Sequence, residues 1–329
     1  MVVDVHAHAM DAEFLDWLVL QPGCGPKISG DAQTGYFTPG YGAMDRLVWD
    51  LEARLESLRT RGIELQLFGP SPGMMSTRQA AASLELATQV NRSTTRIVDQ
   101  ADGRMLGLVV LPLAEPEEIE RHLLGQLSTG RFGGVALPTT AGGIPLDEPC
   151  FEIVWQLLSR HSLIGFMHPV GGVQRDTLDR WTLNTLVQYP TETTIAVSRL
   201  IFAGVLERYP GLKLVLAHGG GTLPYLAGRL DLGFFADSYE ANPECRAAIT
   251  RPPSEYLRGL YFDTLVPGPA QLQMLIGWAG PTQVVFGSDF PYEIGDPEGA
   301  YALPTIARQP ETTQHLILRT NAMRLLGRL

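Results

Sequence analysis

Basic residues are scarce in this chain, and lysine is almost absent. The 329 residues include 25 lysines and arginines together against 35 acidic residues, which gives a formal net charge of −10. The two lysines are Lys27 and Lys213, and the arginines are scattered singly. Because binding to nucleic-acid phosphates needs clustered basic side chains, this distribution argues against a nucleic-acid partner.

Long apolar runs and a leader pattern are also lacking. No apolar run reaches the roughly 18 residues that a membrane-spanning helix needs. Residues 1–20 have no basic segment followed by an apolar one, which is the pattern of a secretory signal. The three cysteines, Cys24, Cys150 and Cys245, lack the spacing of a metal site and favour reduced thiols. We therefore expect a cytoplasmic protein without a membrane partner.

No linker-like or low-complexity stretch divides the sequence, so residues 1–329 are expected to form one domain. Short apolar runs recur, and most are followed by a helix-like segment. The runs are 2–8, 63–70, 105–113, 133–139, 163–169, 212–218, 259–265 and 283–289. Continuous apolar runs are typical of parallel strands buried on both faces. Their alternation with helices predicts an α/β fold, a (β/α)₈ TIM barrel.

Two segments depart from this alternation. The first two runs are separated by an insertion at about residues 20–45, which is rich in glycine and proline. It is far longer than the usual loop of about 2–6 residues. We expect a lid over the active face, because loops after the strands build barrel active sites; a surface hairpin without a role in the site is the alternative. Residues of about 300–329 are expected to form closing helices against the barrel.

Four potential metal ligands stand where apolar runs give way to glycine, proline or small polar residues. They are His6, His8, His168 and Asp289. This is the pattern of side chains at the C-terminal ends of buried barrel strands. Alternate residues of a strand share a face, so His6 and His8 converge directly. Three imidazoles and one carboxylate suit a catalytic Zn²⁺ with an open coordination position.

A single buried histidine is more often a hydrogen-bonded core residue than a ligand, so the signal lies in the cluster and not in any one motif. Apart from these ligands and His218, which ends the sixth run, the histidines are His122, His161 and His315, which stand beside charged or polar neighbours. For these three we expect exposed positions at the surface.

The scarcity of lysine also limits the number of metal ions that the centre can hold. A carbamylated lysine that bridges two metals would stand at the end of the fourth run, where residues 135–139 read Val-Ala-Leu-Pro-Thr. Neither Lys27 nor Lys213 is expected to reach that position. The predicted centre is therefore mononuclear.

His218 ends the sixth run and is followed by three glycines. A histidine beside the ion can take a proton from metal-activated water near pH 7, so we expect His218 to be the catalytic base. A fifth metal ligand or a structural hydrogen-bond partner are the alternatives. Asp289 has a second expected role in catalysis, because a carboxylate bound through one oxygen can relay a proton with the other.

With these residues assembled, the chain resembles the amidohydrolase superfamily, in particular the decarboxylase branch typified by 2-amino-3-carboxymuconate 6-semialdehyde decarboxylase. The resemblance extends over most of the length. It rests on Asp-Val-His-Ala-His at 4–8, Met-His-Pro at 167–169, Ala-His-Gly-Gly-Gly-Thr-Leu-Pro-Tyr-Leu-Ala-Gly-Arg-Leu-Asp at 217–231, Arg-Pro-Pro-Ser-Glu-Tyr at 251–256 and Gly-Ser-Asp-Phe-Pro-Tyr at 287–292.

The resemblance implies one Zn²⁺ per subunit, held by the four ligands named above, with His218 activating a bound water. It also implies that Arg54 binds a substrate carboxylate and that Arg229 does so from the neighbouring subunit of a homodimer. A planar guanidinium suits this task because it can pair with both carboxylate oxygens. Trp181 and Tyr292 match aromatic pocket positions.

Each of these four residues has an alternative interpretation. Arg54 could be an exposed charge on an amphipathic helix. Arg229 could pair with Asp231 or Asp237 at the surface. Trp181 and Tyr292 could pack against the barrel mouth.

The chain departs from the typical member in two places. Val170-Gly171-Gly172 follows His168-Pro169 where the typical member has Trp-Asp, and Tyr292 stands where Phe is found. These differences leave the predicted fold and metal site unchanged and affect the choice of substrate.

Three functions are compatible with the sequence. The first is a non-oxidative decarboxylase of a small anionic carboxylic acid, such as an aromatic acid or a ring-cleavage product. The second is a hydrolase or hydratase of a lactone, amide or conjugated acid that uses the same ion. The third is a non-enzymatic protein with a structural zinc, for which four closed ligands and no adjacent base are typical.

Overall fold

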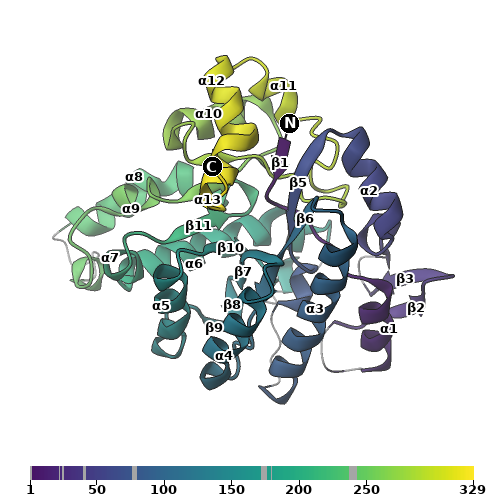
Figure 1. The fold of residues 1–329 in the computed structure, drawn as a ribbon. Helices are drawn as coiled ribbons and strands as arrows, with labels where there is room; N and C mark the ends of the chain where they lie inside the picture. The colour runs from purple at the N-terminus through teal and green to yellow at the C-terminus, as the bar shows by residue number, and fades with distance from the viewer. Residues whose placement is uncertain are drawn as a thin grey trace.

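A barrel of eight parallel strands forms the centre of the computed structural model, which describes residues 2–21, 23, 26–39, 42–75, 80–171, 176–178, 180–236 and 243–329 (Figure 1). The strands are β1 (Val2–Asp4), β5 (Ile63–Phe68), β6 (Met105–Val110), β7 (Phe132–Pro138), β10 (Ile164–His168), β11 (Lys213–Leu216), β12 (Tyr261–Asp263) and β13 (Val284–Val285). They are hydrogen-bonded in this order, which is also their order along the chain. The predicted TIM barrel is confirmed.

The first and last strands approach each other through the segments that follow them. The Val5 N–H donates to the Phe286 carbonyl at 2.9 Å, and the Asp289 N–H donates to the His6 carbonyl at 2.8 Å. An isolated parallel bridge joins Ala7 to Phe290. These contacts place the N-terminal histidines beside Asp289, although the two segments are 281 or more positions apart in sequence.

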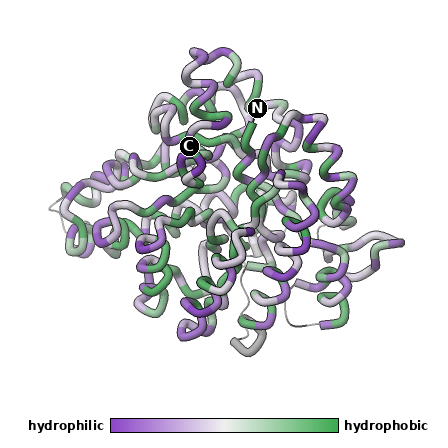
Figure 2. Tube along the Cα trace, viewed as in Figure 1, coloured by the Kyte–Doolittle hydropathy of each residue, from purple (hydrophilic) through white to green (hydrophobic). Residues whose placement is uncertain are grey.

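The apolar runs form strands because both of their faces are buried. All six residues of β6 are buried, as are the last five residues of β7. Burying apolar surface contributes about 25 cal/mol for each Å² removed from water. Figure 2 shows the apolar strand segments inside and the polar positions mainly on the outer helices.

Helices cover the outside of the barrel between successive strands. They are α2 (Leu51–Thr60), α3 (Ala80–Gln100), α4 (Pro116–Leu127), α5 (Glu152–Arg160), α6 (Tyr189–Phe202), α7 (Val205–Arg208), α8 (Leu223–Phe235), α9 (Pro253–Leu257) and α10 (Pro269–Ala279). Local signals set their starts; for example, the Asp50 carboxylate accepts the N–H of Ala53 at 3.0 Å and caps α2. No helix among these described segments has the length and apolarity needed to cross a bilayer.

Helix α1 (Ala12–Leu20) precedes the insertion of about 20–45, which contains a small antiparallel sheet of β2 (Ser29–Asp31), β3 (Gly35–Thr38) and β4 (Gly42–Ala43). This sheet lies at the edge of the molecule beside α1 (Figure 1). Tyr36 fixes it there, because its buried side chain donates a hydrogen bond to the Asp16 carboxylate at 2.7 Å.

The last helices of the chain are α11 (Ala302–Ile306), α12 (Glu311–His315) and α13 (Asn321–Leu325). Residues 316–320 and α13 pack against β1 and β13, and α11 packs against α10. The Asn321 amide donates to the Val284 carbonyl at 2.8 Å, and the Phe286 N–H donates to the Ile317 carbonyl at 3.0 Å. These bonds tie residues 317–321 to the end of β13.

One sequence prediction about the surface is wrong. His161 and His315 are exposed as expected, but His122 is buried on α4. Its Nε2 accepts a hydrogen bond at 2.7 Å from the side-chain amide of Asn91 on α3, and the same amide donates to the Val110 carbonyl. His122 therefore joins two helices to β6, a role that its polar sequence neighbours conceal.

We expect His122 to make folding stability dependent on pH. Burial, and then the nearby Arg121, lower the pKa of His122 below its usual value. The unfolded chain therefore binds this proton more readily, so the contribution is present above pH 6.5 and is lost as the pH falls below it. When the pH is lowered from 7.5 to 5.5, the urea midpoint of unfolding should fall further for the wild type than for His122→Gln. Equal losses would contradict this assignment.

Candidate metal centre

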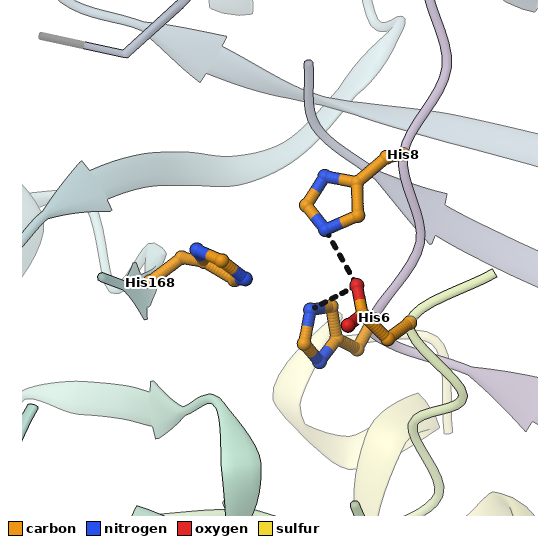
Figure 3. A group of neighbouring side chains, drawn as sticks. His6, His8 and His168 are labelled. Carbon is orange, nitrogen blue, oxygen red and sulfur yellow. Dashed lines mark ion pairs between the residues drawn. The ribbon is translucent and has the colours of Figure 1, made fainter. Parts of the chain in front are cut away.

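The four predicted ligands lie together at the C-terminal ends of the barrel strands. His6 and His8 occupy the extended segment after β1, His168 is the last residue of β10, and Asp289 follows β13. All four are buried. The rings of the three histidines point toward a common centre, as Figure 3 shows.

Backbone and carboxylate acceptors fix the orientation of each ring. Nδ1 of His6 lies 2.7 Å from Asp263 Oδ2, Nδ1 of His8 lies 2.8 Å from the Pro70 carbonyl oxygen, and Nδ1 of His168 lies 2.6 Å from the Pro169 carbonyl oxygen. Each acceptor favours a proton on Nδ1, which leaves the Nε2 lone pair facing the centre.

The atoms that face the centre lack hydrogen-bond partners. Nε2 of His6, His8 and His168 and Oδ1 of Asp289 are buried and make no hydrogen bond within the described part of the chain. Among them, Asp289 Oδ1 forms ion pairs with Nε2 of His8 at 2.9 Å and with Nε2 of His6 at 3.3 Å (Figure 3). These donor atoms all lie within 4.8 Å of one another. Buried lone pairs without a partner are costly, and a divalent ion satisfies all four together. The donor set therefore fits a small divalent cation.

The charges of the site are coupled. Without an ion, burial lowers the pKa of His6, but the Asp289 charge and the hydrogen bond to Asp263 raise it to about 10, so a bound cation would take the place of the proton on Nε2. Burial raises the pKa of Asp289, but His6, His218 and His8 hold it well below its usual value. Burial, and then the neighbouring histidines, lower the pKa of His168. The pocket thus keeps one carboxylate ionised among imidazoles.

Two glycines allow the close approach of these strands. A Cβ at Gly287 would lie 2.8 Å from the Cβ of His6 and 2.9 Å from that of Asp263. A Cβ at Gly295 would lie 2.7 Å from the Cβ of Asp289. Real Cβ atoms do not approach so closely, so a side chain at either position would displace a residue of the centre.

His218 lies beside the four ligands and outside their cluster. Its Nε2 is 3.8 Å from Asp289 Oδ2, and its ring centroid is 4.9 Å from that of His168. Its Nδ1 is buried and makes no hydrogen bond with the described residues. This location permits proton transfer near the centre.

Asp263, at the end of β12, is a site residue that the sequence reasoning missed. Besides His6, its carboxylate contacts the backbone of the turn that carries His218. Its signal was present, because Asp263 is the one charged residue of the seventh apolar run, 259–265.

A cavity of about 320 Å³ opens beside His218 and Asp289. Its walls are mainly apolar and include Leu186, Leu265, Val266, Met274, Leu275 and Ile294. Since a cavity of about 150 Å³ can hold benzene, this space suits one substituted aromatic ring. None of the described insertion residues, 20, 21, 23, 26–39 and 42–45, lines it, so the lid function stays a prediction.

Arg54 is buried, and the alternative of an exposed helical charge is wrong. Its guanidinium donates to Gln66 Oε1 from Nε at 3.0 Å and from Nη2 at 2.7 Å. Its Nη1 donates at 2.8 Å to the carbonyl oxygens of His8 and Leu47. Arg54 lines a separate cavity of about 150 Å³. The described contacts give it a structural role at His8, and substrate binding stays a prediction.

The other three predicted pocket residues differ in exposure. Trp181 is 71% exposed and stacks with the Arg180 guanidinium. Tyr292 is partly buried, with its ring centroid 5.2 Å from that of His8 and its hydroxyl bonded to Ser71. Arg229 is exposed on α8.

The surface alternatives proposed for Arg229 remain open. Asp231 accepts the Ser254 N–H at 2.8 Å, and Asp237 lies outside the described residues.

A histidine and carboxylate cluster at the C-terminal end of a parallel barrel, next to an apolar cavity, defines the class of metal-dependent barrel enzymes. Residues 3–328 match the amidohydrolase family. The chain belongs to this family, as its sequence predicts.

Two relatives are named as decarboxylases. The chain is 27% identical to 2-amino-3-carboxymuconate-6-semialdehyde decarboxylase of Dictyostelium discoideum, over 99% of this chain and 91% of the relative. It is 30% identical to 6-methylsalicylic acid decarboxylase of Penicillium expansum, over 88% and 84%.

A solved structure of 5-carboxyvanillate decarboxylase from Novosphingobium aromaticivorans, with bound manganese, has the same fold. Its TM-score is 0.84 at 19% identity, and the match covers 99% of this chain and 97% of that one.

Proposed function

We propose that the protein is a metal-dependent, non-oxidative decarboxylase of a small aromatic acid or aromatic ring-cleavage product. The observation that carries this proposal is the placement of His218 and Asp289, two proton-transfer groups, where the ligand cluster meets an apolar cavity the size of one substituted ring. The decarboxylase activity of the relatives supports the same reaction class.

The reaction balances without an oxidant or a reductant. The bond between the substrate carbon and its carboxylate breaks, CO₂ leaves, and the electron pair remains on the carbon, which takes up a proton. His218 lies close enough to Asp289 for the two residues to hold and deliver that proton. The apolar walls orient the ring and exclude water, which favours loss of the carboxylate charge as CO₂.

A divalent ion in the four-ligand centre supplies a positive charge that stabilises the negative charge developing as the bond breaks. We propose Zn²⁺, because three imidazoles with one carboxylate suit it. Manganese is the competing ion, since it is bound in the related 5-carboxyvanillate decarboxylase. A cytoplasmic location likewise stays a prediction from the sequence.

We also propose a homodimer in which Arg229 reaches the neighbouring subunit's site. Support comes from the exposed face of α8, which carries apolar side chains around Arg229. Tyr225 is 83% exposed, Leu232 is 63% exposed and Phe235 is 63% exposed. Exposed apolar side chains that recur on one helix face are typical of a protein–protein interface.

Mixing two defective variants tests this arrangement. Arg229→Ala and His218→Ala should each lose activity alone. In a mixed dimer, one site keeps both native residues, so random re-association should restore roughly a quarter of the native sites. Mixed dimers that form and stay inactive would contradict donation of Arg229 across the interface.

The reaction is tested with carboxyl-¹³C-labelled acids incubated with the metal-loaded protein. The panel should include alkylated hydroxybenzoic acids and a ring-cleavage dicarboxylate. Release of ¹³CO₂ in equal amount to a decarboxylated product is expected for at least one acid. A product that has gained water and kept its label would favour the hydrolase or hydratase instead.

A further inference from the structure

One buried carboxylate touches both the metal-ligand cluster and the predicted base. Asp263 is fully buried at the end of β12. Its Oδ2 lies 2.7 Å from His6 Nδ1 and accepts the His218 N–H at 3.1 Å. Its Oδ1 accepts the N–H of Gly219 at 2.7 Å and that of Leu265 at 3.1 Å. Four donors from three segments therefore meet at one side chain.

The contact with His6 fixes which ring nitrogen is available. A carboxylate facing Nδ1 holds the proton there, so the lone pair stays on Nε2, which lies 3.3 Å from Asp289 Oδ1. Such carboxylate–histidine pairs orient metal-ligating rings and increase their basicity. Without the carboxylate, the proton could occupy Nε2 and block that ligand atom.

The contacts with the turn hold His218 in an uncommon conformation. His218 has φ 57° and Gly219 has φ 59°, both in the left-handed region that residues with a Cβ rarely adopt. Successive backbone N–H groups in such turns form a concave site for an anion. The Asp263 carboxylate occupies this position and offsets the cost of the strained turn.

The surroundings leave little freedom to the carboxylate. A Cβ at Gly287 would lie 2.9 Å from the Asp263 Cβ and 2.8 Å from the His6 Cβ. The segment after β13 therefore packs directly against both residues, and glycine permits it. This packing keeps the His6–Asp263 pair in one arrangement.

We infer that Asp263 is a positioning residue that couples the metal ligand His6 to the base His218. The inference rests on the proposed metal site. It makes the orientation of His6 and the backbone of the His218 turn dependent on the same charge. Loss of that charge must disturb both.

Asp263→Asn tests the coupling, because the amide keeps the size of the side chain but turns a donor toward groups that are themselves donors. Zinc affinity, measured by competition with a chromophoric chelator, should fall about 10–100-fold. Backbone amide exchange at His218 and Gly219 should accelerate by about tenfold or more, as expected when a hydrogen bond to a charged group is lost. Both measurements are made without substrate.

Asp296→Asn is the matched control. Asp296 is also a buried carboxylate, and it accepts the N–H groups of Tyr301 and Ala302 at the start of α11. This variant should lose folding stability while zinc affinity and exchange at His218 stay at wild-type values. A merely structural effect of removing a buried charge would appear equally in both variants.

The outcomes separate this inference from the proposed function. A wild type that binds neither zinc nor manganese overturns the metal site and the decarboxylase proposal together. A wild type that binds zinc, with Asp263→Asn binding it equally, overturns the coupling alone. If Asp263→Asn does not fold, ¹⁵N spectra of the zinc-loaded wild type decide, because His6 must carry its proton on Nδ1. A proton-free Nδ1 would overturn the inference.

Discussion

His218→Ala should lower the rate of CO₂ release from an accepted substrate by about 10²–10⁴-fold, the range typical of a lost general acid or base. The reason is geometric. His218 lies 3.8 Å from Asp289 Oδ2, lines the cavity beside it and stands outside the ligand cluster. Its removal therefore deprives the reaction of a proton-transfer group and leaves the metal ligands in place.

The decisive comparison is between rate and bound metal. His218→Ala should keep the wild-type metal content, and His161→Ala should match the wild type in both measurements because His161 is exposed. A rate that is unchanged in His218→Ala would remove the proposed base. Loss of metal in the same variant would instead support the alternative that His218 is a ligand.

His168→Ala should lose both metal and activity. The His168 Nε2 is one of the buried donor atoms that face the centre without a hydrogen-bond partner. Deleting a direct ligand should weaken metal binding by more than the 10–100-fold that is typical when only the partner of a ligand is changed. The rate should fall accordingly, since the ion supplies charge stabilisation in the reaction.

The matched control for this change is His315→Ala, because His315 is exposed on α12. It should bind metal and release CO₂ as the wild type does. Metal content is measured by elemental mass spectrometry after gel filtration, and folding is checked by circular dichroism. A folded His168→Ala protein with native metal affinity would show that His168 is not a ligand.

The barrel and the ligand cluster were predictable because both follow from short local patterns in the sequence. Each apolar run is long enough to span a buried strand, and the residues at its C-terminal end must meet at one face of the barrel. His6, His8, His168 and Asp289 could therefore be brought together without knowing any distance. The strand limits were less predictable; β1 ends at Asp4, before both of its histidines.

The hydrogen-bond partners of buried polar side chains were not predictable in the same way. Arg54 reads as a charge on an amphipathic helix, but its burial depends on acceptors at Gln66, His8 and Leu47 that only the folded chain supplies. His122 was misjudged for a similar reason, since Asn91 lies on another helix. A buried polar side chain is stable only with partners, and those partners are distant in sequence.

Metal stoichiometry tests the central claim most directly. Purified, folded protein that has been stripped with a chelator and then titrated with Zn²⁺ should take up one tightly bound ion per chain. The same titration of His6→Ala/Asp289→Asn should show no such site. Wild-type protein that takes up no ion, or that binds two ions at this centre, would contradict the mononuclear site on which the proposed decarboxylation depends.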